Sequence, residues 1–398
     1  MGMYIPNINE FPKFDLIRLL TTCFGKPENK MRVCILIDLP DLDLMENLKF
    51  TENEEFAVQT HGVNKFFKPL NSDLGCDFNV SQVDLFAFKT TFGSNLDPED
   101  EAVDISGNRL SLDKDIYSKY DIILATTDYS LTAPLTAKAK EYGFRGATLH
   151  GLNEIILNSG LSVDYNEISR QAEVFRKVLT SSDSFVITFE VLNEKFSLKL
   201  VCDKQDAQKS HGLCPAGKPD VANLPAGEVY FVPSGADGSF PFRYSDGTIA
   251  EMTVREGRII SAKLLKGDRK LVDARNLQLE EDPATGIIGE LGFGTQLLPF
   301  SGKDIQDEKI FGTCHVATGR SDHLGGNLTP ELFNSKMNAS HDDILYAPPK
   351  TPEINVISVQ MHKNGDCTEI FSNYEPTPWL LEQVSSVYPV EKFSALTV

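Results

Sequence analysis

The feature that most constrains the fold is a change in hydrophobic pattern along the 398-residue chain. In the N-terminal part, residues 33–37 and 122–125 form short, nearly continuous apolar runs, and residues 130–143 have the composition of a helix. Unbroken apolar runs are typical of strands buried on both faces of a parallel sheet, and their alternation with helices indicates β-α-β units. Residues 1–150 are therefore predicted to form an α/β domain with a mainly parallel sheet.

After residue 150 the pattern becomes that of paired strands. Residues 164–179 form one further amphipathic helix, because their apolar side chains recur every three or four positions. Alternating apolar segments then flank turn residues, first around Asn193 and later around Asn364-Gly365. We predict that residues 151–398 form an α+β domain rich in antiparallel strands, and that this domain carries the functional site.

Composition excludes several classes of partner. Acidic residues outnumber basic ones by 57 to 38, which gives a net charge of −19 and opposes non-specific binding to nucleic acid or anionic membranes. The sequence shows neither a signal peptide nor a run of about 18 apolar residues. The seven cysteines are scattered without a C-x-x-C pair, a pattern typical of free thiols. We expect a cytoplasmic protein without nucleic-acid or membrane partners.

Carboxylates and histidines in glycine-rich segments are the candidates for chemistry, whereas His-Glu-x-x-His, Walker and Gly-x-Ser-x-Gly motifs are absent. His341 and Asp343 are two positions apart, so in an extended chain both project from one face and Asp342 points away. The glycines are expected to form sharp turns that bring separate segments together. Taken singly, each residue fits an ordinary turn or a structural histidine. The resemblance described next is what joins five of them into a metal-binding set, namely Glu228, Glu290, His315, His341 and Asp343.

In their order along the chain, these segments resemble the aminopeptidase T family of metallopeptidases. The resemblance is clearest over residues 223–346 and rests on Leu-Pro-Ala-Gly-Glu at 224–228, Gly-Glu-Leu-Gly at 289–292, Thr-x-His-x-Ala-x-Gly at 313–319 and His-x-Asp at 341–343. It implies a homodimeric, leucyl aminopeptidase-like hydrolase that releases N-terminal residues from a peptide or another small-molecule substrate.

The resemblance also implies a site for two divalent metal ions. Two such ions about 3.5–4 Å apart lower the pKa of a bound water and polarise a carbonyl group. Oxygen and imidazole ligands without thiolate are compatible with zinc, cobalt, manganese or iron. Glu290 is the candidate for the bridging ligand or for the general base. The implied metal ligands are Glu228, Glu290, Glu308, His315, His341 and Asp343.

Two positions depart from the family pattern, and both lie beside the expected chemistry. The position of the family's catalytic tyrosine is Asp322 here, and His323 follows it. The family has a glutamate where this chain has Ile310, and Glu308 lies two residues earlier. The predicted catalytic residues are therefore Glu290, with His323 and Asp322 as replacements for the missing phenol.

Two alternatives to a peptidase remain open. His315, His341 and Asp343 form a two-histidine, one-carboxylate set, the arrangement of mononuclear non-haem iron enzymes. The aminopeptidase T scaffold is itself similar to that of dihydroxypyridine ring-cleaving dioxygenases. The missing tyrosine also fits a relative that binds metal without catalysis.

Overall fold

The chain forms two compact units. The structure, a computed structural model, describes residues 3–389 and 391–394. The N-terminal unit comprises Asn7–Ser169 and His211–Ala226; the C-terminal unit comprises Met1–Pro6, Arg170–Ser210 and Gly227–Val398. Whether residues 1–150 and 151–398 fold as separate domains stays a prediction. Among the described residues, no helix has the length and apolar character needed to cross a membrane.

The N-terminal unit contains one seven-stranded sheet with the order β10-β6-β5-β1-β2-β3-β4. Five of its strands run parallel, namely β1 (Met31–Leu39), β2 (Val80–Lys89), β5 (Ile122–Thr126), β6 (Arg145–Thr148) and β10 (Val221–Asn223). Two short antiparallel strands extend it, β3 (Ala102–Asp104) and β4 (Arg109–Leu110). The predicted α/β character of this part is therefore present.

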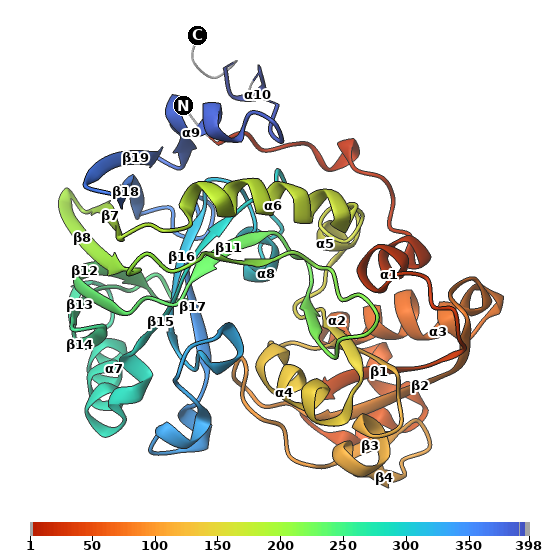
Figure 1. Cartoon of the computed structure of the whole chain (residues 1–398). Coiled ribbons are helices and arrows are strands. Elements are labelled where there is room, and N and C mark those ends of the chain that lie inside the picture. Colours follow the sequence, from red (N-terminus) through yellow and green to blue (C-terminus); the bar gives the residue numbers. More distant parts are fainter. Residues whose placement is uncertain (1–2, 390, 395–398) are drawn as a thin grey trace. The chain divides into compact units, whose positions relative to one another are not determined.

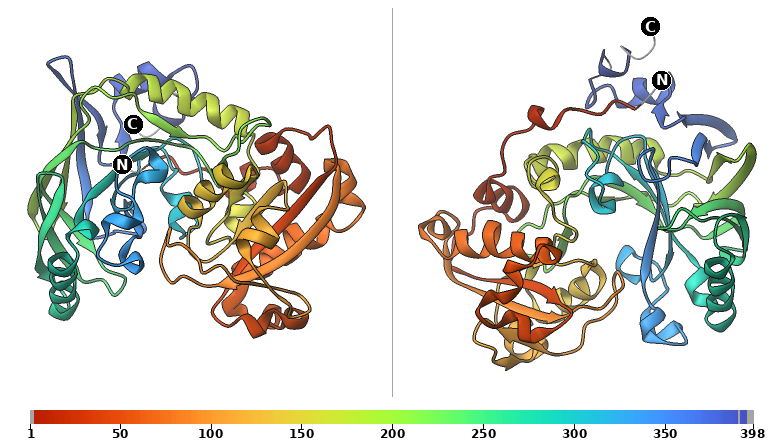
Figure 2. Two further views of the ribbon diagram at one scale, coloured as in Figure 1. Left: turned by 60° about the horizontal axis from the view of Figure 1, so that its bottom comes forward. Right: turned by 180° about the vertical axis from the view of Figure 1, so that it is seen from behind.

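Helices cover both faces of this sheet (Figures 1 and 2). Leu36 and its alternate neighbours in β1 pack against Leu135 of α4, whereas Ile37, on the opposite face, lies against Gly62. Gly143 adopts a left-handed conformation, with φ of 86°, and ends α4 as predicted. The α-helices of the unit are α1 (Leu16–Phe24), α2 (Ala57–His61), α3 (Lys68–Leu70), α4 (Thr132–Tyr142) and α5 (Glu154–Leu157).

The C-terminal unit is built on two antiparallel sheets. The five-stranded sheet has the order β17-β16-β15-β11-β9, with strands β9 (Gln208–Ser210), β11 (Glu228–Phe231), β15 (Ile288–Gly294), β16 (Cys314–Gly319) and β17 (His341–Tyr346). The eight-stranded sheet has the order β14-β13-β12-β8-β7-β18-β19-β20, with strands β7 (Ser184–Val191), β8 (Glu194–Val201), β12 (Gly235–Arg243), β13 (Ile249–Arg255), β14 (Arg258–Lys266), β18 (Asn355–Lys363), β19 (Asp366–Ser372) and β20 (Glu375–Pro376). Both predicted hairpins are confirmed, as β7–β8 and β18–β19.

An aromatic core joins the two sheets and the C-terminal part of the long helix α6 (Tyr165–Leu179). Phe185 of β7 and Phe293 of β15 have ring centroids 5.4 Å apart, and Phe175 of α6 packs edge-on against Phe293. The remaining helices are α7 (Arg269–Glu281), α8 (Asp304–Asp307), α9 (Pro378–Val384) and α10 (Glu391–Ser394). This core fixes one face of the five-stranded sheet and leaves its other face for the site.

Candidate metal centre

The candidate ligands lie on the face of the five-stranded sheet that points away from the core. Along β15, Leu291 and Phe293 enter the core, so Glu290 and Gly292 project from the opposite face. Gly292 is the register partner of His315 on β16. Alternation along each strand therefore separates packing residues from candidate ligands.

Small residues on this face make room for the candidate ligands. Ala317 on β16 lies between Glu290 on β15 and Asp343 on β17 in the sheet register, and Gly319 is the partner of His341. His341 and Asp343 are both on β17, as the spacing predicted, because this segment is extended. Side chains that project from this face of neighbouring strands can therefore converge over short residues.

The role expected of the glycines was wrong at Gly292. Gly292 lies inside β15 rather than in a turn, and a Cβ atom there would stand 2.1 Å from Cε1 and 2.2 Å from Nε2 of His315. The glycine is needed because the imidazole ring occupies the space of a side chain. The glycine-rich composition thus reflects a close approach across two strands.

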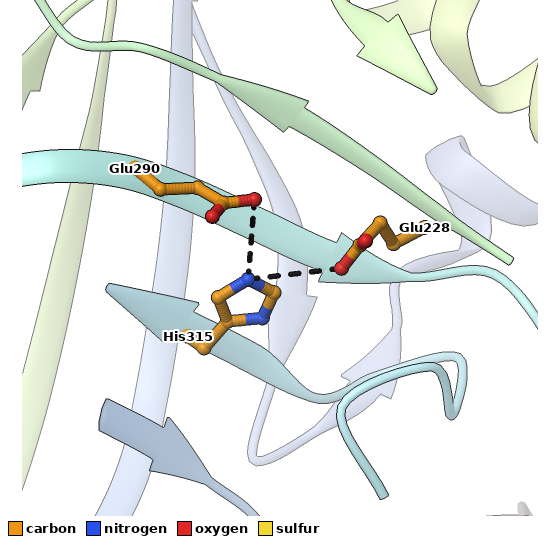
Figure 3. Close-up of side chains that lie close together, drawn as sticks. All are labelled: Glu228, Glu290 and His315. Carbon is orange, nitrogen blue, oxygen red and sulfur yellow. Dashed lines mark ion pairs between the residues drawn. The ribbon is translucent and has the colours of Figure 1, made fainter. Parts of the chain in front are cut away.

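His315 and His341 both point at the Glu290 carboxylate. His315 Nε2 lies 3.5 Å from Glu290 Oε1 and 3.7 Å from Glu228 Oε2 (Figure 3). The same atom lies 4.0 Å from Asp343 Oδ1. His341 Nε2 lies 3.0 Å from Glu290 Oε2 and 3.3 Å from Asp343 Oδ1. Both histidines, Glu228 and Glu290 are buried, and Asp343 is partly exposed. The structure therefore brings together all five residues of the metal-binding set.

A backbone contact fixes the orientation of His341. Its Nδ1 atom lies 2.6 Å from the carbonyl oxygen of Arg320, and because a carbonyl only accepts hydrogen bonds, Nδ1 carries the proton. The other ring nitrogen, Nε2, then carries a lone pair in the neutral ring or a second proton in the charged ring, and it faces Glu290 and Asp343. Metal-binding histidines are held in the same way by a partner on the second ring nitrogen.

The charged groups in this cluster strongly shift one another's pKa values. Burial would raise the pKa of Glu290, but hydrogen bonds from His315 and His341 outweigh it and lower that pKa to about 2. Burial would lower the pKa of His315, but the hydrogen bond with Glu290 and nearby carboxylates raise it to about 10. In the metal-free protein, protons on the two histidines therefore balance part of the carboxylate charge.

The donor set fits a divalent cation. The described residues provide two groups of converging ligand atoms, Glu228–Glu290–His315 and Glu290–His341–Asp343, which share Glu290. The Oδ1 atom of Asp343 is buried and has no hydrogen-bond partner among the described residues, and the same holds for Nδ1 of His315. An unpaired buried carboxylate oxygen costs free energy unless a cation or water satisfies it. The ligand atoms are imidazole nitrogens and carboxylate oxygens, a set that suits iron, zinc or manganese.

Three further predicted residues surround the cluster without joining either group. Glu308 Oε1 is bound by Lys309 Nζ at 2.6 Å, so this carboxylate faces an ammonium group. Asp322 Oδ1 accepts a hydrogen bond from Arg320 Nε at 2.7 Å. The His323 ring lies edge-on to the His341 ring, with centroids 5.0 Å apart. A role of Glu308 as metal ligand, and catalytic roles of Asp322 and His323, stay predictions.

Sequence reasoning missed Lys309 and Arg320. Lys309 is only 1% exposed and lies 2.7 Å from Glu228 Oε1. In the sequence, Asp307, Glu308 and Lys309 form a run of charges that is typical of an exposed turn. No local pattern distinguishes a buried lysine from an exposed one at such a position. Arg320 matters through its backbone carbonyl, which carries no sequence signal.

Fold and site together define an α/β protein with a candidate metal centre on an antiparallel sheet. The structure is similar to that of 2,5-dihydroxypyridine dioxygenase from Pseudomonas putida KT2440, with a TM-score of 0.55 and 12% sequence identity over 87% of this chain and 92% of that chain. At this identity the likeness shows the fold alone. No family model matches the chain, and no curated protein sequence does.

These comparisons correct the predicted family. The resemblance to the aminopeptidase T family has no support, because no family model matches and the similar solved structure is a dioxygenase. The predicted leucyl aminopeptidase-like hydrolase activity is wrong for the same reason. The motifs that carried the resemblance describe how carboxylates and histidines are spaced on neighbouring strands. A fold and a ligand spacing do not by themselves fix the reaction.

Proposed function

We propose that this chain is an iron(II)-dependent dioxygenase that opens a hydroxylated aromatic or heteroaromatic ring. The observation that carries the proposal is the approach of two imidazoles to one buried carboxylate oxygen, since His341 Nε2 and His315 Nε2 lie 3.3 Å and 4.0 Å from Asp343 Oδ1. The fold shared with 2,5-dihydroxypyridine dioxygenase supports it. Because an electron-rich ring itself supplies the electrons that reduce dioxygen, such a reaction needs no further reductant.

Some residues of the proposed site would bind an ion, and others would accept a proton. His315, His341 and Asp343 would hold ferrous iron, and such an ion would supply open coordination positions for dioxygen and for a substrate hydroxyl group. The Arg320 carbonyl keeps His341 in the orientation that presents Nε2. The Asp343 carboxylate holds its negative charge, because neighbouring positive charges lower its pKa although burial opposes this.

His323 is our candidate for the proton acceptor. Burial lowers the pKa of this histidine, and the nearby Asp322 carboxylate only partly offsets that effect. The imidazole is therefore uncharged at neutral pH, and its Nδ1 atom has no hydrogen-bond partner among the described residues. A neutral imidazole beside His341 can accept a proton from a bound substrate hydroxyl group. Asp322 is held by Arg320 and orients this part of the site.

The test is oxygen uptake by protein loaded with ferrous iron under anaerobic conditions. The substrate panel contains 2,5-dihydroxypyridine and several dihydroxybenzenes, and oxygen-18-labelled dioxygen is expected to place both atoms in the ring-opened product. Asp343→Asn should lower iron affinity at least about 100-fold, since it removes a charged ligand. Asp342→Asn is the matched control, because this neighbouring side chain is bonded to Ser340 instead. Tight iron binding without iron-dependent oxygen uptake on the whole panel would refute the proposal.

A further inference from the structure

Lys309 places a positive charge inside the site without help from a metal ion. Its Nζ atom lies 2.7 Å from Glu228 Oε1 and 2.6 Å from Glu308 Oε1, and its side chain is 1% exposed. Lysine is rarely buried this completely, because removing an ammonium group from water is costly unless carboxylates surround it. Here two buried carboxylates compensate for that cost. The ammonium group is therefore a built-in cation of the centre.

The two groups of converging ligand atoms differ in whether the Lys309 ammonium group is already paired with one of their carboxylates. In the group formed by Glu228, Glu290 and His315, the Glu228 carboxylate is already paired with Lys309 through Oε1, while its Oε2 atom lies 3.7 Å from His315 Nε2. In the group formed with His341 and Asp343, the neighbours of the buried Oδ1 atom of Asp343 are the imidazoles of His341, at 3.3 Å, and of His315, at 4.0 Å. Imidazoles can lose a proton and become metal ligands, whereas an ammonium group cannot bind a metal. The place for an external cation is therefore on the Asp343 side.

We propose that the Lys309 ammonium group takes the place of a second metal ion, so that the centre binds a single divalent ion next to Glu290, His341 and Asp343. A divalent ion held by Glu228 would lie close to the ammonium group, and the two positive charges would repel each other strongly in this buried setting. This inference deepens the proposed function, since a one-ion centre is what a mononuclear dioxygenase requires. It replaces the two-ion centre that the sequence predicted.

His315 lies beside the ligands of this ion. Two ligand atoms that each bind one ion at about 2.1 Å can be at most about 4.2 Å apart. His315 Nε2 lies 4.0 Å from Asp343 Oδ1 and 3.5 Å from Glu290 Oε1. His341 Nε2 lies 3.3 Å from the same Oδ1 atom. Each of these pairs is within that limit, and Glu290 is the residue that the two groups of ligand atoms share.

The experiment counts manganese ions on the full chain. Isothermal titration with Mn(II), and metal content after gel filtration, should give one ion per wild-type chain, and the electron paramagnetic resonance spectrum should be that of isolated Mn(II). In Lys309→Met the carboxylates of Glu228 and Glu308 lose their cation, so we expect a second bound ion and an exchange-coupled spectrum. Lys303→Met, which changes an exposed lysine in the same segment, should bind one ion.

Two results would overturn the inference: two ions on the wild-type chain, or a folded Lys309→Met variant that still binds only one. The wild-type count decides the matter if the variant does not fold. The readout is independent of catalysis. One ion per chain without oxygen uptake would refute the proposed dioxygenase and leave the one-ion centre supported. Oxygen uptake with two ions per chain would support the dioxygenase and refute the role proposed for Lys309.

Discussion

Gly292→Ala should dislodge a candidate metal ligand without altering any ligand. An added Cβ atom would stand 2.1 Å from Cε1 of His315, whereas ordinary contact begins at 3.4 Å. The imidazole ring must therefore move by about 1.3 Å, the difference between these two distances. His315 is only 1% exposed, so the ring has no open space to move into.

The expected loss of metal affinity follows from the narrow range of ligand distances in metal sites. Ligand distances in such sites vary by only about 0.2 Å, and a misplacement of about 1 Å in a site costs on the order of 100-fold. We expect Gly292→Ala to weaken Mn(II) or Fe(II) binding about 100-fold, equivalent to about 2.8 kcal/mol. Overpacking should also lower the free energy of unfolding of the metal-free protein, by about 1–3 kcal/mol.

Titration calorimetry measures the metal affinity, and thermal unfolding of the metal-free protein measures the packing cost separately. Gly235→Ala is the matched control, because a Cβ atom there meets Val201 at an ordinary 3.8 Å and the glycine also lies in a strand. The control should bind metal like the wild type. If folded Gly292→Ala binds metal within about threefold of the wild-type affinity, His315 is not a ligand or its ring is not held by β15.

Three further outcomes follow from the charges. Because the pKa of His315 is raised to about 10, its proton competes with the metal ion. The metal affinity should therefore rise between pH 6 and 9, by up to about tenfold per pH unit for each proton displaced. Calorimetry in buffers of different ionisation enthalpy measures the number of protons released. Glu290→Gln should bring the pKa of His315 in the metal-free protein down toward its ordinary range, which NMR titration of the ring measures; an unchanged value would show that Glu290 is not its main partner. In the N-terminal unit, burial and Asp128 raise the pKa of Asp38 from 3.8 to about 6, so the folded state holds the proton more tightly and stability should fall as pH rises from about 4 to 6. Asp38→Asn keeps a side-chain oxygen that accepts the hydrogen bond from Gln59. The variant should lose the decline of stability between about pH 4 and 6, and its free energy of unfolding at pH 7 should be higher by up to about 3 kcal/mol. Denaturant titration measures both effects.

The sequence predicted much of the architecture because hydrophobic period is a local property. The unbroken apolar runs at residues 33–37 and 122–125 became the parallel strands β1 and β5, and both predicted hairpins formed. The spacing of His341 and Asp343 also placed them correctly on one extended strand. These features depend on the alternation of side chains within a few residues. They can therefore be deduced without knowledge of tertiary contacts.

The remaining parts of the site depend on contacts between distant segments. Gly292 was interpreted as a turn residue because nothing nearby in the sequence indicates that an imidazole from β16 lies over it. Lys309 was overlooked because its burial is decided by Glu228, which is 81 positions earlier by residue number. Composition shows which residues can bear charge. It does not show which charges the fold removes from water.

The same distinction explains why the motifs led to the wrong reaction. A site built on adjacent antiparallel strands needs ligands at alternate positions and small residues opposite them, as Ala317 stands between Glu290 and Asp343. Any metal centre built on this face would reproduce that spacing, whatever bond it breaks. The groups that decide the reaction are those that set the number of ions and handle protons, and the residues that we propose for these roles are Lys309 and His323. Both lie outside the pattern that carried the resemblance, so variants at these two positions discriminate between reactions better than variants of the ligands.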